Sequence, residues 1–236
     1  MLIGRKKEIK LLGEVLSSPK AEMIAVLGRR RVGKTFLINN VYENDIIFRQ
    51  TGVRNATNEE QLRAFMVNVE RLAGKKMEVA HDWLDAFFRL RDAVEPKLHK
   101  DKKQVIFFDE LSWLAVKGSK FLDFLAYFWN DWASRQNLVI VLCGSASSWI
   151  IQKVINDKGG LHNRVTKYIR LRPFTLLETE TYLKSRHFTF TRYQIVQLYM
   201  AFGGVPLYLE EIRKGKSVIQ NINLSLIHIS EPTRPY

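Results

Sequence analysis

The segment that most constrains this chain is an apolar run that leads directly into a glycine-rich turn. Residues 21–28 read AEMIAVLG and residues 28–35 read GRRRVGKT, so the pattern G-x-x-x-x-G-K-[ST] begins where the apolar run ends. Helical spacing resumes at once in TFLINNVY, residues 35–42. A strand, a glycine-rich turn and a helix in this order form the context in which the pattern binds phosphate. The segment therefore predicts a phosphate-binding loop at the carboxyl end of a buried strand.

Strand and helix patterns alternate along most of the chain. Further strands are expected at residues 45–50, 104–110, 137–144 and 166–174. Helical spacing is found at residues 5–16, 35–42, 58–73, 82–94, 120–135 and 147–156. This alternation predicts a three-layer α/β fold around a parallel five-stranded sheet.

The end of the sheet region is marked by a proline. Pro173 is expected to close the last strand, as Asp82 is expected to cap the helix 82–94 and Pro96 to end it. Only helical patterns follow Pro173, at residues 176–185, 192–202 and 206–215. We therefore expect an α/β domain in residues 1–174 and a C-terminal helical lid in residues 175–223.

The glycine-rich turn contains the residues that are needed to bind a nucleoside triphosphate. Gly28 and Gly33 permit backbone conformations in which successive N–H groups face phosphate oxygens at a helix N-terminus. Lys34 is expected to reach the β- and γ-phosphates, and the Thr35 hydroxyl to ligate Mg²⁺. The candidate nucleotide-binding residues of the loop are Gly28, Arg29, Arg30, Arg31, Val32, Gly33, Lys34, Thr35 and Phe36. A basic surface for nucleic acid, or a glycine turn with an incidental lysine, are the alternatives.

A second motif, FFDE, supplies the acidic partners of this loop. Asp109 is expected to hold Mg²⁺ through water at the end of its strand, and Glu110 to polarise an attacking water as a general base. The glutamate adjacent to Asp109 favours hydrolysis of the nucleotide over simple nucleotide transfer. Because no Asn-Lys-x-Asp guanine-reading motif is present, ATP is the expected nucleotide. An ordinary acidic strand end is the alternative.

Two later positions extend the candidate site. Ser145 or Ser147, after the strand ending in CGSAS, is expected to sense the γ-phosphate or orient the water, although serines also cap helices. Arg164 precedes the last strand and could reach the nucleotide of a neighbouring subunit as an arginine finger. A plain surface arginine is the alternative for Arg164.

The charge and composition of the chain indicate which partners and which cellular compartment suit it. Basic residues outnumber acidic ones 37 to 24, a net charge of +13, which suits a polyanionic partner or a lysine-rich surface. The single cysteine, Cys143, favours a reduced cytoplasmic setting. No apolar run reaches the roughly 18–20 residues that span a bilayer, so no membrane association is expected.

Taken together, the motifs resemble the archaeal-type P-loop ATPases, which are related to the STAND and AAA+ classes. The matching segments are IGRKKEI, GRRRVGKT, FFDELSWL, FWNDWA, CGSASSWI, KGGLHNRVTKYIRLRPF and GGVPLYLEEI. They run from Ile3 to about Ile222. The resemblance implies an ASCE/AAA+-like P-loop NTPase fold with the helical lid.

The resemblance also assigns residues that spacing alone does not. It implies that Gly4 and Arg5 lie along the adenine and that Pro206 of the Gly-x-Pro motif packs near the base. It further implies that Asp109 and Glu110 are the Mg²⁺-holding and catalytic acids and that Arg164 is the candidate finger. A simple turn between two helices is the alternative for Gly203, Gly204 and Pro206.

Members of the resembling family normally continue into a winged helix and, in many cases, a nuclease-like domain. Neither is recognisable here. Residues 224–236, LSLIHISEPTRPY, match a translated sequencing adapter, and we expect them to be a non-native tail. A frayed natural tail is the alternative. Any DNA contact through the missing region is left open.

The sequence therefore predicts a regulated, Mg²⁺-dependent ATPase with ATP and ADP as ligands. Two alternatives remain open: a nucleotide-dependent switch, and a DNA-associated ATPase in defence, mobile-element or genome-maintenance functions. Assembly into a homo-oligomer is compatible with all three.

Overall fold

The computed structural model describes residues 2–156, 160–161 and 163–230, and the chain forms two compact units. The sheet unit comprises Lys6–Arg29 and Lys34–Arg170. The helical unit comprises the described residues of Met1–Arg5, Arg30–Gly33 and Leu171–Tyr236. The middle of the glycine-rich loop is thus grouped with the C-terminal helices. The domain boundaries expected from the sequence stay predictions.

The sheet unit is built on one five-stranded sheet of order β2-β3-β4-β1-β5, in which every pairing is parallel. The strands are β1 (Glu22–Leu27), β2 (Ile46–Thr51), β3 (Gln104–Asp109), β4 (Leu138–Gly144) and β5 (Lys167–Arg170). The parallel α/β fold expected from the sequence is confirmed. All residues of β1, β3 and β4 are buried, as expected for strands covered on both faces.

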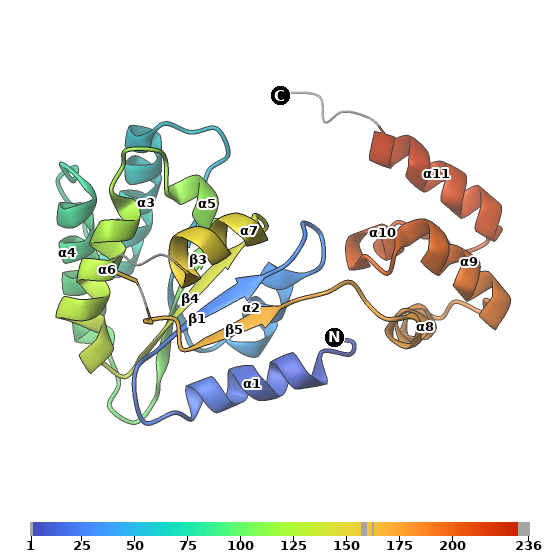
Figure 1. Cartoon of the computed structure of the whole chain (residues 1–236), viewed down its shortest axis with the longest axis horizontal. Helices are drawn as coiled ribbons and strands as arrows, with labels where there is room; N and C mark the ends of the chain where they lie inside the picture. The colour runs from blue at the N-terminus through green and yellow to red at the C-terminus, as the bar shows by residue number, and fades with distance from the viewer. Residues whose placement is uncertain (1, 157–159, 162, 231–236) are drawn as a thin grey trace. The chain divides into compact units, whose positions relative to one another are not determined.

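Helices cover both faces of this sheet, with α1 and α2 on one face and α3, α4 and α6 on the other (Figure 1). The helices of the sheet unit are α1 (Lys6–Leu16), α2 (Lys34–Val41), α3 (Asn58–Ala73), α4 (Trp83–Val94), α5 (Leu111–Leu114), α6 (Phe121–Asp131) and α7 (Ser147–Ile150). Met23, Ala25 and Leu27 alternate along β1 and join a core that includes an aromatic cluster. In that cluster the rings of Trp83 and Phe121 meet edge to face at 4.7 Å.

Several element ends follow the sequence prediction, and others differ from it. Asp82 caps α4 as predicted, its carboxylate accepting from the Asp85 N–H at 2.9 Å. The predicted helix 120–135 breaks at Trp132, and a 3₁₀ turn, η2 (Ala133–Arg135), follows. The predicted helix 147–156 is a short α7 continued by a π-turn, η3 (Ile151–Ile155).

The last strand is shorter than predicted because its partner strand ends. Among the residues that the structure describes, β5 pairs only with β1, and Arg170 lies opposite Leu27, the final residue of β1. At Gly28 the chain turns into the loop, so residues after Arg170 have no neighbouring strand to bond. The strand therefore stops at Arg170 instead of continuing to Pro173.

The helical unit contains α8 (Leu176–Ser185), α9 (Arg192–Phe202), α10 (Pro206–Glu210) and α11 (Val218–Ser230). Thr175 and Thr191 begin α8 and α9 with capping boxes, and Gly203 ends α9 in the left-handed region. The unit has its own core, which includes Phe174, Leu198 and Leu209. α10 is shorter than expected, and α11 extends through residues 224–230, where no helical stripe was recognised in the sequence. Within residues 2–156, 160–161 and 163–230, no helix is both long and apolar enough to cross a bilayer.

Candidate functional site

The glycine-rich loop joins the end of β1 to the start of α2. Three of its residues have positive φ angles: Gly28 at 155°, Arg31 at 69° and Gly33 at 89°. Glycine adopts such angles at little cost, whereas Arg31 is a non-glycine residue in the left-handed region. The glycines expected to shape a phosphate loop therefore lie where the backbone requires them.

Lys34 is the first residue of α2, and its ammonium group turns back onto the loop. Its Nζ donates to Gly28 O at 2.9 Å and to Arg29 O at 3.0 Å, and the residue is only 6% exposed. An ammonium group has three donors. Two of them hold the loop closed, and the third has the capacity to bond an anion beside the N-terminus of α2.

Thr35 and Asp109 meet although 74 positions separate them in the chain. The Thr35 hydroxyl donates to Asp109 Oδ2 at 2.7 Å, and the Glu110 N–H donates to Asp109 Oδ1 at 2.9 Å. Asp109 ends β3 and is 4% exposed. The two predicted Mg²⁺ residues are therefore brought together, at the carboxyl ends of parallel strands where α/β sheets bind ligands.

The donor set at this position fits magnesium. A hydroxyl oxygen and a carboxylate oxygen are hard ligands, and Mg²⁺ is commonly bound by one or two such protein groups with phosphate and water completing the shell. In the described part of the chain, no group of three or more histidine, cysteine or acidic residues forms a metal cage. A metal at Thr35 and Asp109 would thus take its remaining ligands from a nucleotide and from water.

Burial also changes the pKa of Cys143, a residue that interacts with Asp109. Cys143 lies in β4, and its burial raises the pKa of the thiol well above the ordinary value, an effect that the negative charge of Asp109 reinforces. The thiol is therefore protonated. Asp109 accepts hydrogen bonds from the Thr35 hydroxyl and from the backbone of Glu110.

Glu110 directs its carboxylate at the end of the neighbouring strand. Glu110 Oε2 accepts from Ser145 Oγ at 2.9 Å and from the Ser145 N–H at 3.3 Å. Ala146, not a serine, is the N-cap of α7, and it makes no side-chain capping bond. Of the two predicted serines, Ser145 is thus the one that contacts the candidate general base.

A glycine outside the sequence motifs, Gly52, supports this turn. The Gly52 N–H donates to Asp109 O at 2.9 Å. A Cβ on Gly52 would lie 2.6 Å from Glu110 O and 2.8 Å from Trp113 Cβ. The Gln61 side chain also ties Val53 O to Trp113 O, with hydrogen bonds of 2.6 and 2.9 Å. The loop after β2 therefore packs directly against the backbone that carries Asp109 and Glu110.

Substitution of this glycine tests the packing. Gly52→Ala is expected to lower the free energy of unfolding by about 1–3 kcal/mol, the usual cost of overpacking, and to slow the hydrolysis predicted from the sequence by displacing Glu110. Gly13→Ala is the matched control, because a Cβ there meets nothing within 4 Å in the exposed face of α1. That control is expected to stabilise the protein by about 0.5–1 kcal/mol. Chemical denaturation and phosphate release measure both, and equal stabilities of the two variants would contradict the packing argument.

The helical unit holds most of the other predicted nucleotide residues. Gly4 and Arg5 have consecutive left-handed φ angles of 65° and 59°. Pro206 is the first residue of α10, after the turn at Gly203 and Gly204, so the alternative reading as a helix–helix turn also describes it. In the same unit Arg31 lies over the Tyr208 ring, with 5.4 Å from Cζ to the centroid. Arg29 and Arg30 are exposed, as is Phe36 of α2, and their roles stay predictions.

The strand register separates Arg164 from the loop of its own chain. Lys167 begins β5 opposite Ile24, and Arg164 lies in an exposed turn before it, its N–H donating to Leu161 O at 3.0 Å. Arg164 is therefore at the amino ends of the strands, whereas the loop follows their carboxyl ends. A finger role toward a neighbouring subunit stays a prediction. Arg170 lies opposite Leu27 at the carboxyl end of β5 and is exposed.

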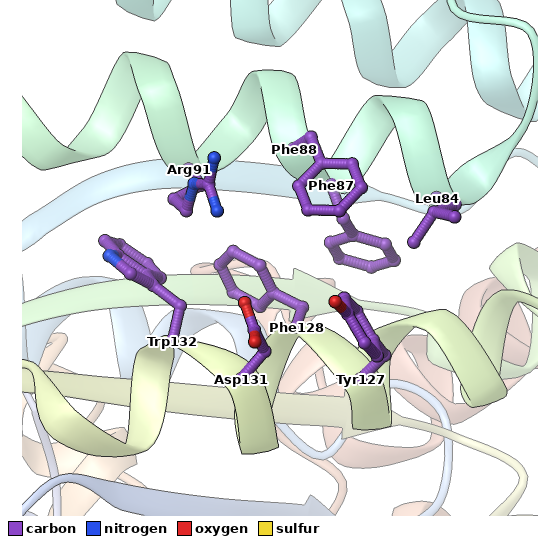
Figure 2. Close-up of a pocket in the computed structure, with 8 residues that line it drawn as sticks. All are labelled: Leu84, Phe87, Phe88, Arg91, Tyr127, Phe128, Asp131 and Trp132. Carbon is purple, nitrogen blue, oxygen red and sulfur yellow. The ribbon is translucent and has the colours of Figure 1, made fainter.

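A pocket elsewhere in the sheet unit is lined in part by residues of the segment FWNDWA, residues 128–133. Figure 2 shows it between α4 and α6, with aromatic rings from both helices facing each other. It is lined by Leu84, Phe87, Phe88, Arg91, Tyr127, Phe128, Asp131 and Trp132. The pocket contains none of the predicted site residues, so it adds nothing to the nucleotide site.

Comparisons with known proteins agree with the motifs and the fold. The sequence model of a family described as an ATPase domain predominantly from Archaea matches residues 2–212. An uncharacterised protein of Methanocaldococcus jannaschii is 25% identical over 213 residues, which are 90% of this chain and 44% of that protein. The chain therefore spans less than half the length of this curated relative.

Two solved structures share the fold. A Walker-type ATPase of Pyrococcus abyssi aligns with a TM-score of 0.69 and 20% identity, over 97% of this chain and 72% of that one. A signal transduction ATPase with numerous domains (STAND) from Pyrococcus horikoshii, with a tetratricopeptide repeat sensor, aligns with a TM-score of 0.54 and 17% identity. The second alignment covers 98% of this chain and 33% of that one.

Proposed function

The chain belongs to the family of ATPase domains found predominantly in Archaea, and on that premise we propose that it binds ATP with Mg²⁺ and hydrolyses it. The observation that carries the proposal is the hydrogen-bonded series from Thr35 to Asp109 and from Glu110 to Ser145. It joins the residue after the loop lysine to an acidic pair and a serine at the carboxyl ends of neighbouring strands.

Each residue has a role that follows from its position. Lys34 and the N-terminus of α2 bind the phosphates, and Thr35 and Asp109 hold Mg²⁺, which when bound neutralises phosphate charge. Glu110 orients a water and takes its proton as the water oxygen bonds to the γ-phosphorus and the bond to the ADP oxygen breaks. The products are ADP and phosphate. Ser145 holds one Glu110 oxygen, so the carboxylate is positioned before the nucleotide arrives.

The adenine is assigned to the helical unit. Gly4, Arg5 and Pro206 are the proposed contacts, and the same unit contains Arg30–Gly33 of the loop. A preference for adenine over guanine is expected. The preference agrees with the absence of a guanine-reading motif from the sequence.

Ligand-dependent stability tests the proposal directly. ATP or ADP at about 100 times its dissociation constant is expected to add roughly 2.7 kcal/mol to the free energy of unfolding, since binding to the native state alone is linked to folding. GTP at the same concentration is expected to add less. Thermal unfolding with each nucleotide, with and without Mg²⁺, measures this, and no change with ATP would refute the proposal.

A second candidate function is a nucleotide-dependent switch. The observation that favours it is the grouping of Arg30–Gly33 with the C-terminal helices, where Arg31 lies over Tyr208. When ADP is exchanged for ATP, a rearrangement of the loop would change the contacts of the helical unit. In that case nucleotide exchange, and not ATP hydrolysis, would be the function. Contact with DNA, a homo-oligomer and a cytoplasmic setting also stay proposals from sequence.

A further inference from the structure

We propose that Arg5 is a positioning residue of the phosphate-binding loop: it fixes the Val32 carbonyl and so makes phosphate affinity depend on the start of α8. The inference rests on the proposed function, because it concerns the same loop. It goes beyond the proposed adenine contact, since it gives the Arg5 side chain a role toward the phosphates that does not require a base. All the contacts that carry it lie within the helical unit.

The backbone of Arg5 is held by a glutamate of α8. Glu178 Oε1 accepts from the Arg5 N–H at 3.3 Å, and Glu178 Oε2 accepts from the Thr175 N–H at 2.8 Å. Partial burial acts to raise the pKa of Glu178, but these hydrogen bonds lower it below its ordinary value, so the carboxylate is charged. A Cβ on Gly4 would lie 2.2 Å from Glu178 Oε1. Glycine at position 4 is therefore what lets the carboxylate bridge the turn and α8.

The side chain of Arg5 lies between an aromatic ring and the loop. Its Cζ is 4.8 Å from the Phe174 ring centroid, and its Nη2 donates to Val32 O at 3.3 Å. Arg5 is 7% exposed and Val32 is 1% exposed, so water is largely excluded from this contact. A planar guanidinium can stack on a ring and donate in its own plane at once, which an ammonium group cannot do.

The Val32 carbonyl matters because of the peptide bond that contains it. In a trans peptide the C=O of one residue and the N–H of the next point in opposite directions, and no cis bond occurs in the described chain. Fixing Val32 O therefore fixes the direction of the Gly33 N–H, which is one of the donors that such a loop presents to phosphate. Arg31 and Gly33, on either side of Val32, both have positive φ angles, so this part of the loop has an unusual backbone that needs support.

The support comes from the start of α8. Phe174 immediately precedes the capping residue of that helix, and Glu178 is in its first turn. A change in the position of this helix end would therefore alter the contact between Arg5 and Val32 O. Phosphate affinity would change with it, which gives the C-terminal helices a direct means of controlling the loop.

Inorganic tripolyphosphate separates this role from recognition of the base. Arg5→Lys is expected to raise the dissociation constant of both ATP and tripolyphosphate by about tenfold, the loss of one charged hydrogen bond. A residue that contacts only adenine would leave tripolyphosphate binding unchanged. Arg172→Lys, at an exposed arginine of the same unit, is the control and is expected to bind both ligands like the wild type. Isothermal titration calorimetry measures the affinities of the wild type and of both variants for both ligands.

A second variant pair keeps the test decisive if Arg5→Lys does not fold. Phe174→Leu removes the ring under Arg5 and is expected to weaken tripolyphosphate binding about threefold or more. Phe188→Leu is its matched control, because Phe188 packs on the same core and lies near Arg186 instead. Equal tripolyphosphate affinity in both phenylalanine variants would overturn the inference, as would wild-type affinity in Arg5→Lys. If the wild type binds neither ATP nor tripolyphosphate, the proposed function itself fails.

Discussion

Lys34→Ala is expected to abolish measurable ATP hydrolysis and to weaken ATP binding about 100-fold or more. The substitution removes the cation that faces the phosphates and also the two hydrogen bonds, to Gly28 O and Arg29 O, that close the loop. Hydrogen bonds of charged groups contribute about 1.5–3 kcal/mol each, so losing one phosphate contact and the loop closure accounts for that factor.

The measurement is ATP affinity by calorimetry together with phosphate release. Lys7→Ala, in the exposed part of α1, is the matched lysine control and is expected to behave like the wild type. Circular dichroism shows whether the Lys34 variant is folded, because a buried lysine also supports the loop. Unchanged ATP affinity and turnover in a folded Lys34→Ala protein would show that the loop is not the ATP-binding site.

The other large effect is expected for Glu110→Gln. Hydrolysis should fall about 100-fold or more, the usual contribution of a general base, while ATP affinity stays close to that of the wild type. Binding is kept because the glutamine oxygen can still accept from Ser145 Oγ, which holds Glu110 at 2.9 Å. Single-turnover hydrolysis and ATP titration measure the two quantities, with Glu59→Gln on the exposed face of α3 as the control.

The same variant separates the enzyme from the switch. A downstream activity that depends on the bound nucleotide can be followed in the Glu110→Gln protein. If that activity persists while hydrolysis is lost, nucleotide binding itself controls it. If that activity and hydrolysis disappear together, turnover is the function. Turnover above about a third of the wild-type rate would instead show that Glu110 is not the general base.

The local parts of the fold were predictable from sequence because their causes are local. The apolar run of β1, the glycines of the loop and the spacing of α2 lie within about twenty residues. The cap at Asp82 is likewise a bond between residues three apart. The breaks after α6 and α7 and the early end of β5 depend on packing and on where β1 stops, which no local pattern records.

The residues of the candidate site also fall into those that a sequence motif predicts and those that only the fold reveals. Motif residues such as Thr35 and Asp109 were found separately, and only the sheet order brings them within 2.7 Å. Gly52 and Glu178 were not found, because each is a single residue whose role comes from a distant backbone. The motif of Arg164 is visible in sequence, and the strand register places Arg164 at the amino ends of the strands. Its finger role toward a neighbouring subunit stays a prediction.

The central claim is tested most directly by phosphate release from ATP by the purified wild-type chain, with Lys34→Ala protein from the same preparation as the blank. We predict release that requires Mg²⁺, saturates with ATP and is absent from the Lys34 variant. Wild-type release equal to that of the Lys34 variant at saturating ATP and Mg²⁺ would contradict the assignment of Gly28–Thr35, Asp109 and Glu110 as an ATP-hydrolysing site.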